Sequence, residues 1–336
     1  SKLKTGSDTE ALLHYFINNG PEKTIEKIPG SYTVALAVKW HSAVYVFRDR
    51  YGIRPGCLGW KDGKHVIASE DIAFKKNGAK FIEDLEPGYV YYLLPEGHYK
   101  RKKVCSNNKK HCFFEYNYIS NVGTESNGVN VRRIRELLGE ELAKEHLIKA
   151  DFVSFLPRCP EVAARSYAEK AKLPFVYVFY KTRSERSFLG STSEDRKNSI
   201  KQNLYLNPKI NGKNTIDLLN GKSIVLIDDS TIRGNNSKRA IELLKQAGAS
   251  QIYLVNYTPK IGIIGKDNIP RGCTLGVDMP PDDNFIARQR NKQEIDERIG
   301  ADVRFLSIQG MLNAFEKAGL KKEDLCLFCI GGEKAF

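Results

Sequence analysis

The sequence predicts an α/β protein whose two parts are built differently. From about Val131 onward, apolar runs of strand length alternate with helical stretches, a pattern typical of crossover units on a parallel sheet. Before that point, one helical stretch precedes short β-rich runs separated by polar turns, which indicates antiparallel strands in an α+β arrangement. With 336 residues, 41% of them apolar, the chain is long enough for two compact domains.

The N-terminal part is expected to open with a capped helix. Ser7, Asp8, Thr9 and Glu10 have the order of a capping box, and the apolar period continues to Ile17. The strands expected after it are 32–38, 43–47, 66–68 and 89–94.

The C-terminal part is expected to alternate between the two kinds of element. The helices predicted by apolar periodicity are 132–145, 161–171 and 237–246, and the strands are 152–156, 175–179, 223–227 and 251–256. Linkers are expected near 106–110 and 121–130. The polar stretch 181–214 is longer than an ordinary connection, so it is either a mobile lid or surface disorder.

Charge and hydropathy exclude several classes of partner. The net charge of +13 fits a solvated basic surface or attraction to anionic small molecules. No basic block is interleaved with aromatic residues and no helix-turn-helix pattern is found, so we expect no nucleic-acid partner. No apolar run reaches the ~18–20 residues of a membrane span, and no signal peptide is recognisable. We therefore expect a cytoplasmic protein without a membrane partner.

The seven cysteines point away from a disulfide framework, because no secretory segment accompanies them. Cys326 and Cys329 form a C-x-x-C pair, a spacing that zinc sites share with redox motifs.

The most informative stretch runs from Ile224 to Ser237. An apolar strand delivers Asp228 and Asp229 to its carboxyl end, where open α/β sheets bind ligands. A turn containing Gly234 then opens a helix, whose first amides can hold a phosphate. Adjacent carboxylates can reach ribose hydroxyls or hold a hydrated Mg²⁺. The pattern suits a phosphorylated ribose, with an ordinary acidic strand–turn–helix as the alternative.

This stretch resembles the phosphoribosylpyrophosphate (PRPP) loop of type I phosphoribosyltransferases. It is most similar to V-D-D-S-I-V-R-G-T-T-S of the glutamine PRPP amidotransferases, or amidophosphoribosyltransferases. Other motifs resemble that family in the family's order, and they lie at 7–10, 48–55, 68–70, 84–88, 112–118, 273–279, 299–302 and 326–329.

The resemblance implies a fold and a reaction. Residues 1–110 would be the C-terminal portion of an Ntn-hydrolase glutamine amidotransferase domain, and 111–336 a type I phosphoribosyltransferase domain with a cysteine-bearing C-terminal tail. The implied reaction is the first step of de novo purine synthesis, in which glutamine or ammonia and PRPP give phosphoribosylamine and pyrophosphate. A homo-oligomer, or a hetero-oligomer with a paralogue, is also implied.

The resemblance also assigns residues. Asp8 would hold the α-amino group of glutamine, Asp228 and Asp229 would contact ribose and Mg²⁺, and the following loop would receive the 5′-phosphate. The full substrate-binding set is Asp8, Asp228, Asp229, Ser230, Arg233, Gly234, Asn235, Asn236 and Ser237.

Four cysteines match the ligands of a [4Fe–4S] cluster in one branch of the family, namely Cys112, Cys273, Cys326 and Cys329. A zinc ion or plain reduced thiols are the alternatives. The remaining three cysteines are expected to be ordinary thiols.

The sequence departs from the family pattern at several places. The family's N-terminal nucleophilic cysteine has no counterpart here, so no catalytic nucleophile is expected within this chain: either its segment is missing from the sequence or the protein has no glutaminase. The family's P-V-P-D-S-G loop appears at 156–161 as L-P-R-C-P-E, its lid is shortened to 181–188, and Asn203 stands where a lysine is expected. These changes leave enzymatic activity open.

Three further hypotheses therefore stand beside the active amidotransferase. The first is a catalytically degenerate member acting as a structural or regulatory subunit, and the second an ammonia-dependent transferase without glutaminase. The third, a PRPP-sensing nucleic-acid regulator, would need a DNA-binding element that the sequence does not contain.

Overall fold

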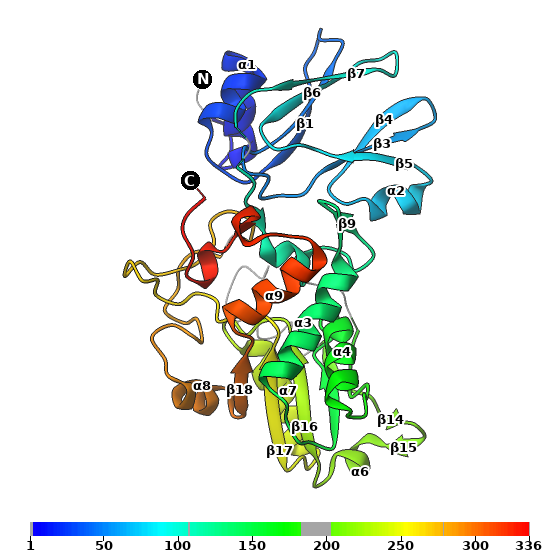
Figure 1. Cartoon of the computed structure of the whole chain (residues 1–336), viewed down its shortest axis with the longest axis vertical. Helices are drawn as coiled ribbons and strands as arrows, with labels where there is room; N and C mark the ends of the chain where they lie inside the picture. Colours follow the sequence, from blue (N-terminus) through cyan, green and yellow to red (C-terminus); the bar gives the residue numbers. More distant parts are fainter. Residues whose placement is uncertain (1–2, 107, 183–202, 278, 336) are drawn as a thin grey trace.

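The computed structural model describes residues 3–106, 108–182, 203–277 and 279–335. An N-terminal part, at the top of Figure 1, is stacked on a C-terminal part along the long axis of the molecule. Most of the expected lid falls in 183–202 and so lies outside the described residues. No helix among the described residues is both long and apolar enough to cross a membrane.

The N-terminal part is a helix layer on two antiparallel sheets. Alternation along β2 explains the layers, because Phe47 packs towards α1 while Val46 packs between the sheets. The helices are α1 (Asp8–Lys27) and α2 (Ile72–Asn77). One sheet has the order β1 (Thr33–Ala37), β2 (Val44–Arg48), β6 (Tyr89–Leu93), β7 (Tyr99–Lys103), and the other β4 (Lys64–Ala68), β3 (Cys57–Lys61), β5 (Lys80–Asp84).

The predicted helix start is correct, but the predicted cap is wrong. The Ser7 side chain makes no capping hydrogen bond. The Glu10 carboxylate instead accepts the backbone N–H groups of Lys4 and Thr5 at 2.8 and 2.7 Å, so it does not reach back to Ser7. The helix also continues to Lys27, past a kink at Gly20.

The C-terminal part is built on a four-stranded parallel sheet covered on both faces. Alternate residues of β16 enter two separate cores, with Val225 and Ile227 on one face and Ile224 and Leu226 on the other. The strand order is β11 (Phe152–Phe155), β16 (Ser223–Asp228), β17 (Gln251–Asn256), β18 (Asp302–Phe305). The first core takes α3 (Val131–Glu145), α4 (Glu161–Ala171) and α9 (Ile308–Ala318), and the second takes α7 (Asn235–Gln246) and α8 (Lys292–Ile299).

The strand expected at 175–179 is not formed as predicted. Phe175 makes only an isolated parallel bridge to Val153, and the Val178 amide donates to the Ser154 hydroxyl instead of extending a ladder. The chain then forms short antiparallel pairs in and beyond the stretch expected as a loop. They are β12 (Phe179–Lys181) with β13 (Leu204–Leu206), and β14 (Lys209–Ile210) with β15 (Lys213–Asn214), followed by α6 (Thr215–Leu219).

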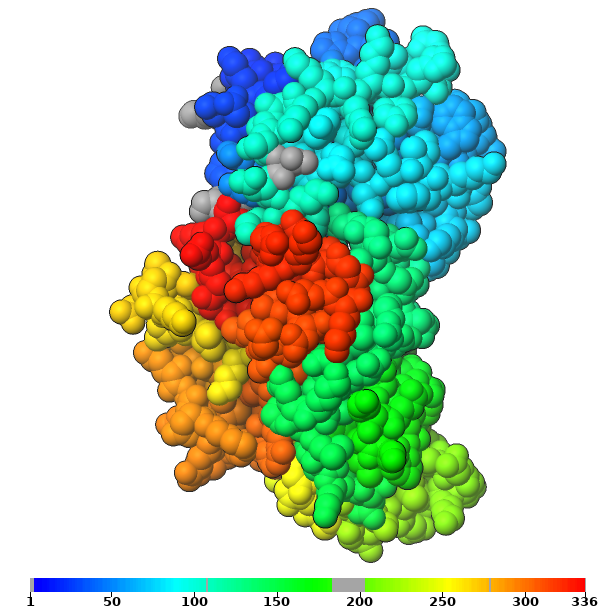
Figure 2. Space-filling view, viewed as in Figure 1, coloured from blue at the N-terminus to red at the C-terminus, as the bar shows by residue number. Residues whose placement is uncertain are grey.

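A short pair of parallel strands lies at the junction of the two parts. β8 (His111–Cys112) pairs in parallel with β19 (Leu325–Cys326), which brings the C-terminal segment to the junction. Figure 2 shows this segment, in red, between the cyan N-terminal part and the green helices. The short elements nearby are η1 (Glu115–Ile119), β9 (Glu125–Ser126), β10 (Val129–Asn130), η3 (Lys322–Asp324) and η4 (Phe328–Ile330).

Three acidic side chains of the N-terminal part accept backbone amides of the C-terminal part. Glu70 accepts the amide of Asn121 at 2.7 Å. Asp71 accepts the amide of Glu125 at 2.9 Å, and Asp84 accepts that of Asn127 at 2.8 Å. These bonds fix the hairpin of β9 and β10, which the sequence had suggested to be part of a linker.

Candidate active site

A cleft of about 600 Å³ opens at the carboxyl ends of β11 and β16. This is the edge at which parallel sheets bind ligands. Asp228 and Asp229 come from the end of β16, and the loop 156–161 comes from the end of β11. The rest of the lining comes from η1 and the loop after it, from α3 and α4, and from Lys181, Leu204 and Asn236.

The acidic pair is buried, with 6% of Asp228 and 9% of Asp229 exposed. The Asp228 carboxylate accepts the Asp229 amide at 2.9 Å and the Ser237 hydroxyl at 3.2 Å. Burial raises the pKa of Asp228 well above its ordinary value, and the neighbouring Asp229 raises it further. Burial also raises the pKa of Asp229. Burying two adjacent negative charges is unfavourable, and a bound cation or several hydroxyl donors would stabilise the charged form of both carboxylates.

The turn after this pair presents the start of α7. Gly234 is the N-cap of the helix and has φ = 78°, a conformation that glycine adopts without strain. A Cβ at this position would lie 2.4 Å from Cδ1 of Ile299 on α8, so the turn is also packed tightly. Thr231 donates to the Asn256 side chain at 2.7 Å, which ties the turn to β17. The first amides of α7 therefore have a fixed direction and carry the positive end of the helix dipole.

Cations also line the cleft. Arg132 of α3, Arg158 of the 156–161 loop and Lys181 of β12 all belong to its lining. Within the described residues, the guanidinium groups of Arg132 and Arg158 make no ion pair or hydrogen bond. Lys181 is close enough to the acidic pair to lower the pKa of both carboxyls. The cleft lining thus combines an acidic pair with three cations, two of whose side chains are unpaired within that part of the chain.

Two further arginines of the lining are already engaged. Arg135 is buried and donates to the backbone oxygens of Tyr116 and Ser120 at 2.9 and 2.8 Å, which shapes the wall formed by η1. Arg165 donates to Glu161 at 3.3 Å and also binds the hydroxyl of Tyr177. These side chains hold the walls of the cleft.

The predicted site residues fall into three groups. Asp228, Asp229 and Asn236 line the cleft. A second group lies in the same turn or at the start of α7 but does not line the cleft, and it consists of Ser230, Gly234, Asn235 and Ser237. Arg233 is directed onto Asp282, while Asp8 is exposed at the start of α1 in the N-terminal part (Figure 1). The structure therefore does not bring Asp8 to the cleft.

Sequence reasoning missed the arginines. Arg158 lies in the 156–161 loop, whose sequence indicated only a departure from the family's P-V-P-D-S-G motif. Arg132 and Arg135 have the i, i+3 spacing of ordinary helix-surface residues. The burial of Arg135 among backbone oxygens has no sequence signal. The expected lysine position is occupied by Asn203, which is buried and shares a hydrogen bond with Thr182 at 3.3 Å.

The four cysteines expected to bind metal are gathered at the junction of the two parts. Cys112 and Cys326 are partners in the β8–β19 register. Cys273 forms an antiparallel bridge with Met279, and Cys329 lies in η4. Burial raises the pKa of Cys329 well above its ordinary value, and the three other thiols raise it further. A Cβ at Gly276 would lie 3.2 Å from Sγ of Cys112, so glycine leaves room beside this sulfur.

The four thiols do not make a compact site for a single ion. Among the described residues, no group of three or more His, Cys, Asp or Glu side chains is drawn together closely enough to hold a metal ion.

The fold defines a class of protein in which a glutaminase-like layered part precedes a phosphoribosyltransferase-like parallel sheet. Residues 1–109 match a family model described as a glutamine amidotransferase domain. The whole chain superimposes on the glutamine PRPP amidotransferase from B. subtilis complexed with ADP and GMP, with a TM-score of 0.83 and 29% identity, covering 100% of this chain and 72% of that one. A structure described as the allosteric regulatory enzyme of purine biosynthesis gives a TM-score of 0.84 with 29% identity over 100% of this chain and 70% of that one.

Curated relatives point to the same family. The amidophosphoribosyltransferase of Archaeoglobus fulgidus is 32% identical over 97% of this chain and 70% of its own length. That of Methanothermobacter thermautotrophicus is 33% identical over 97% of this chain and 67% of its own length. The chain belongs to the amidophosphoribosyltransferase family, and the family and fold predicted from the sequence are confirmed.

Proposed function

We propose that the cleft binds PRPP with Mg²⁺ and transfers its phosphoribosyl group to ammonia, which is the transferase half of the family reaction. The observation that carries this proposal is one cleft lined by the buried carboxylates Asp228 and Asp229, by Asn236 at the start of α7 and by Arg132 and Arg158. A ligand with hydroxyl groups or a bound metal ion, and with more than one anionic group, suits all three features.

Each region of the cleft has a role in this proposal. Asp228 and Asp229 hold the ribose hydroxyls and the hydrated Mg²⁺, and the first amides of α7 hold the 5′-phosphate. Arg158 and Lys181 hold the pyrophosphate, the group for which Asn203 offers no charge. Arg158 therefore supplies from the 156–161 loop a cation that the sequence lacks at 203.

The chemical step makes one bond and breaks one. The nitrogen lone pair of ammonia forms the bond to C1 of the ribose, and the bond from C1 to the pyrophosphate oxygen breaks with its electron pair. A proton leaves the new ammonium group, giving the amine. A Mg²⁺ held by Asp228 and Asp229 would neutralise charge on the departing pyrophosphate, and Arg158 and Lys181 hold that group in place as it leaves.

The transferase proposal is tested by pyrophosphate release from PRPP and Mg²⁺ with excess ammonium, because ammonium makes the reaction independent of glutamine. We expect turnover, and we expect the Asp228→Asn/Asp229→Asn double variant to abolish it. A well-folded wild-type protein that binds PRPP but releases no pyrophosphate would favour the degenerate, structural or regulatory member instead.

For the N-terminal part we propose binding of glutamine, with Asp8 holding its α-amino group. The support is the match of residues 1–109 to a glutamine amidotransferase domain and the exposure of the Asp8 carboxylate at the start of α1. Glutamine affinity of the wild type and of Asp8→Asn, measured by calorimetry, tests this role, and equal affinity would contradict it.

We also propose that Cys112, Cys273, Cys326 and Cys329 hold a [4Fe–4S] cluster. The support is an all-thiol set of four, in which Cys112 and Cys326 pair in the β8–β19 register and the other three thiols are near enough to raise the pKa of Cys329. Such a cluster would tie the C-terminal tail to the junction. We expect about four iron and four sulfide per chain, lost in Cys329→Ser and retained in Cys57→Ser. Stoichiometric zinc in the wild type would contradict the proposal.

A further inference from the structure

The turn that opens α7 is fixed from outside the parallel sheet by the 279–290 segment. This segment belongs to the connection between β17 and α8, whose described residues form only isolated bridges. Connections of this length are uncommon and usually serve a function. None of the residues proposed to bind PRPP belongs to the 279–290 segment, so its attachment to the turn needs a separate explanation.

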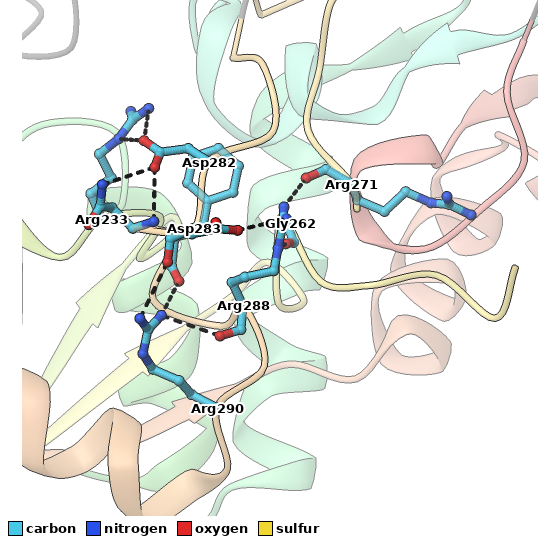
Figure 3. A network of polar contacts seen from close by, with 9 residues as sticks. Arg233, Gly262, Arg271, Asp282, Asp283, Arg288 and Arg290 are labelled. Atoms are coloured by element: carbon cyan, nitrogen blue, oxygen red, sulfur yellow. Dashed lines mark hydrogen bonds and ion pairs between the residues drawn. The ribbon is translucent and has the colours of Figure 1, made fainter. Parts of the chain in front are cut away.

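The main attachment is a two-pronged contact between Arg233 and Asp282. Nε and Nη2 of Arg233 donate to Oδ2 of Asp282 at 3.0 and 2.9 Å. Oδ1 of the same carboxylate accepts the backbone amide of Asn284 at 2.9 Å and its side-chain amide at 3.0 Å. Both oxygens of Asp282 are therefore engaged, which fixes the direction of the carboxylate (Figure 3).

A second attachment runs through the backbone. The Ile286 amide donates to the Ile232 carbonyl at 2.6 Å, one residue before Arg233. The Arg233 guanidinium also lies over the ring of buried Phe285, 5.1 Å from its centroid. Two contacts thus hold the residues immediately before Gly234, where the chain enters α7.

The segment is itself anchored to the core. Arg288 is buried, and its guanidinium donates to the backbone oxygens of Gly262 and Arg271. Figure 3 shows these bonds next to the Arg233–Asp282 contact, with Asp283 directed towards Arg288 and Arg290. Arg233 is therefore tied through Asp282 to a segment that cannot shift freely.

We propose that Asp282 is a positioning residue for the 5′-phosphate: by holding Arg233 it sets the direction of the turn that presents the first amides of α7. This inference rests on the proposed binding of PRPP and deepens it. Asp282 does not line the cleft and acts only through the turn. Its effect falls on the phosphate end of the ligand, since the pyrophosphate end is held by the 156–161 loop and β12.

The partial exposure of the Arg233–Asp282 ion pair predicts how a variant would change stability and phosphate affinity. Arg233 and Asp282 are each about 30% exposed, and partly exposed ion pairs contribute little to stability. Affinity for an anion at a helix start depends more strongly on direction, because small displacements of a preorganised group are costly. Removing the Asp282 charge should weaken phosphate binding with little change in melting temperature.

The experiment compares Asp282→Asn with Asp283→Asn. Asp283 is the neighbouring residue, its side chain is 97% exposed, and its nearest cationic partner is 3.7 Å away, so it is a matched control. Calorimetry is done with two partial ligands, ribose 5-phosphate and magnesium pyrophosphate. We expect Asp282→Asn to lose about tenfold in affinity for ribose 5-phosphate and to bind magnesium pyrophosphate as the wild type does. Asp283→Asn should match the wild type for both ligands.

Other outcomes have definite meanings. Equal ribose 5-phosphate affinity in the two variants would overturn the positioning role, as would an equal loss for both ligands. Wild-type protein that does not bind PRPP would overturn the proposed function itself, which separates the two failures. If Asp282→Asn does not fold, Arg233→Lys is used instead. Lysine keeps the positive charge but lacks the two parallel N–H donors of the guanidinium, so this variant should also lose affinity for ribose 5-phosphate and not for magnesium pyrophosphate. Asp282→Glu should recover part of the affinity.

Discussion

Nη1 of Arg54 lies 3.1 Å from Oε1 of Glu115, and this ion pair crosses the junction between the two parts of the chain. Only 7% of the Glu115 side chain is exposed, against 37% of Arg54. Burial raises the pKa of Glu115, and Arg54 lowers it again. The buried carboxylate thus depends on its partner from the other part.

Replacing Arg54 by Met should therefore destabilise the fold at pH 7.5 by on the order of 1–3 kcal/mol, because a buried charge loses its partner. Without Arg54 the folded-state pKa of Glu115 rises further above its unfolded value. The ionised form then costs stability above that pKa, and the cost disappears as pH falls through it. Urea unfolding at pH 7.5 and at pH 5 should show the deficit narrowing at the lower pH. Arg133→Met, which removes two exposed ion pairs on α3, is the control; an equal deficit in both would argue against this account.

Asp229→Asn should raise the melting temperature while removing the binding of Mg²⁺ and PRPP. Burial raises the folded-state pKa of Asp229 above its unfolded value. The folded state therefore binds the proton more tightly, and ionisation costs stability above the folded pKa. The asparagine avoids this cost, on the order of 1 kcal/mol per pKa unit. Thermal scans should show the gain at pH 7.5 and its loss in acid, whereas Asp62→Asn, at an exposed turn, should show none. A less stable Asp229→Asn would contradict the prediction.

Arg158→Gln should weaken the binding of magnesium pyrophosphate about tenfold or more, the scale of a charged hydrogen bond. Since Arg158 is unpaired within the described chain, the fold should be unaffected. Affinity measured by calorimetry, with Arg298→Gln on the exposed face of α8 as control, checks the prediction. Unchanged pyrophosphate affinity would place the leaving-group site elsewhere in the cleft.

Gly139→Ala should destabilise the C-terminal part, although alanine ordinarily favours a helix over glycine by about 1 kcal/mol. A Cβ at 139 would lie 2.1 Å from the backbone oxygen of Ala163, so α3 and α4 would have to move apart. We expect a loss of about 2 kcal/mol, measured by urea unfolding. Gly6→Ala, where a Cβ meets open space, should show no comparable loss. Equal stability of the two variants would mean that the helices adjust.

Prediction from sequence succeeded where an element has a clear apolar pattern. The strand at 251–256 and the helix at 161–171 were placed with the bounds observed for β17 and α4. It failed for strands that lack buried apolar residues or are interrupted by glycine. β7 is Tyr-Lys-Arg-Lys-Lys with no buried residue, and β3 has Gly59 in its interior, where a Cβ would lie 2.8 Å from the Lys80 backbone oxygen.

The candidate site was predicted on its acidic side only. Asp228 and Asp229 follow directly from an apolar strand, so their position could be inferred locally. The cations reach the cleft from α3, from the loop after β11 and from β12, and only the folded sheet brings these segments together. The contact of Arg233 with Asp282 spans 49 positions and has no local pattern.

The bonds that Glu70, Asp71 and Asp84 accept at the junction have an evolutionary consequence. Their donors are backbone amides, which nearly every residue type supplies, so the hairpin side can drift in sequence while the contact persists. Only proline at 121, 125 or 127 would remove a donor. For these three bonds selection would thus act on the acidic side, and the side-chain partner across the contact that could change together with an acid is Thr124, whose hydroxyl also donates to Glu70.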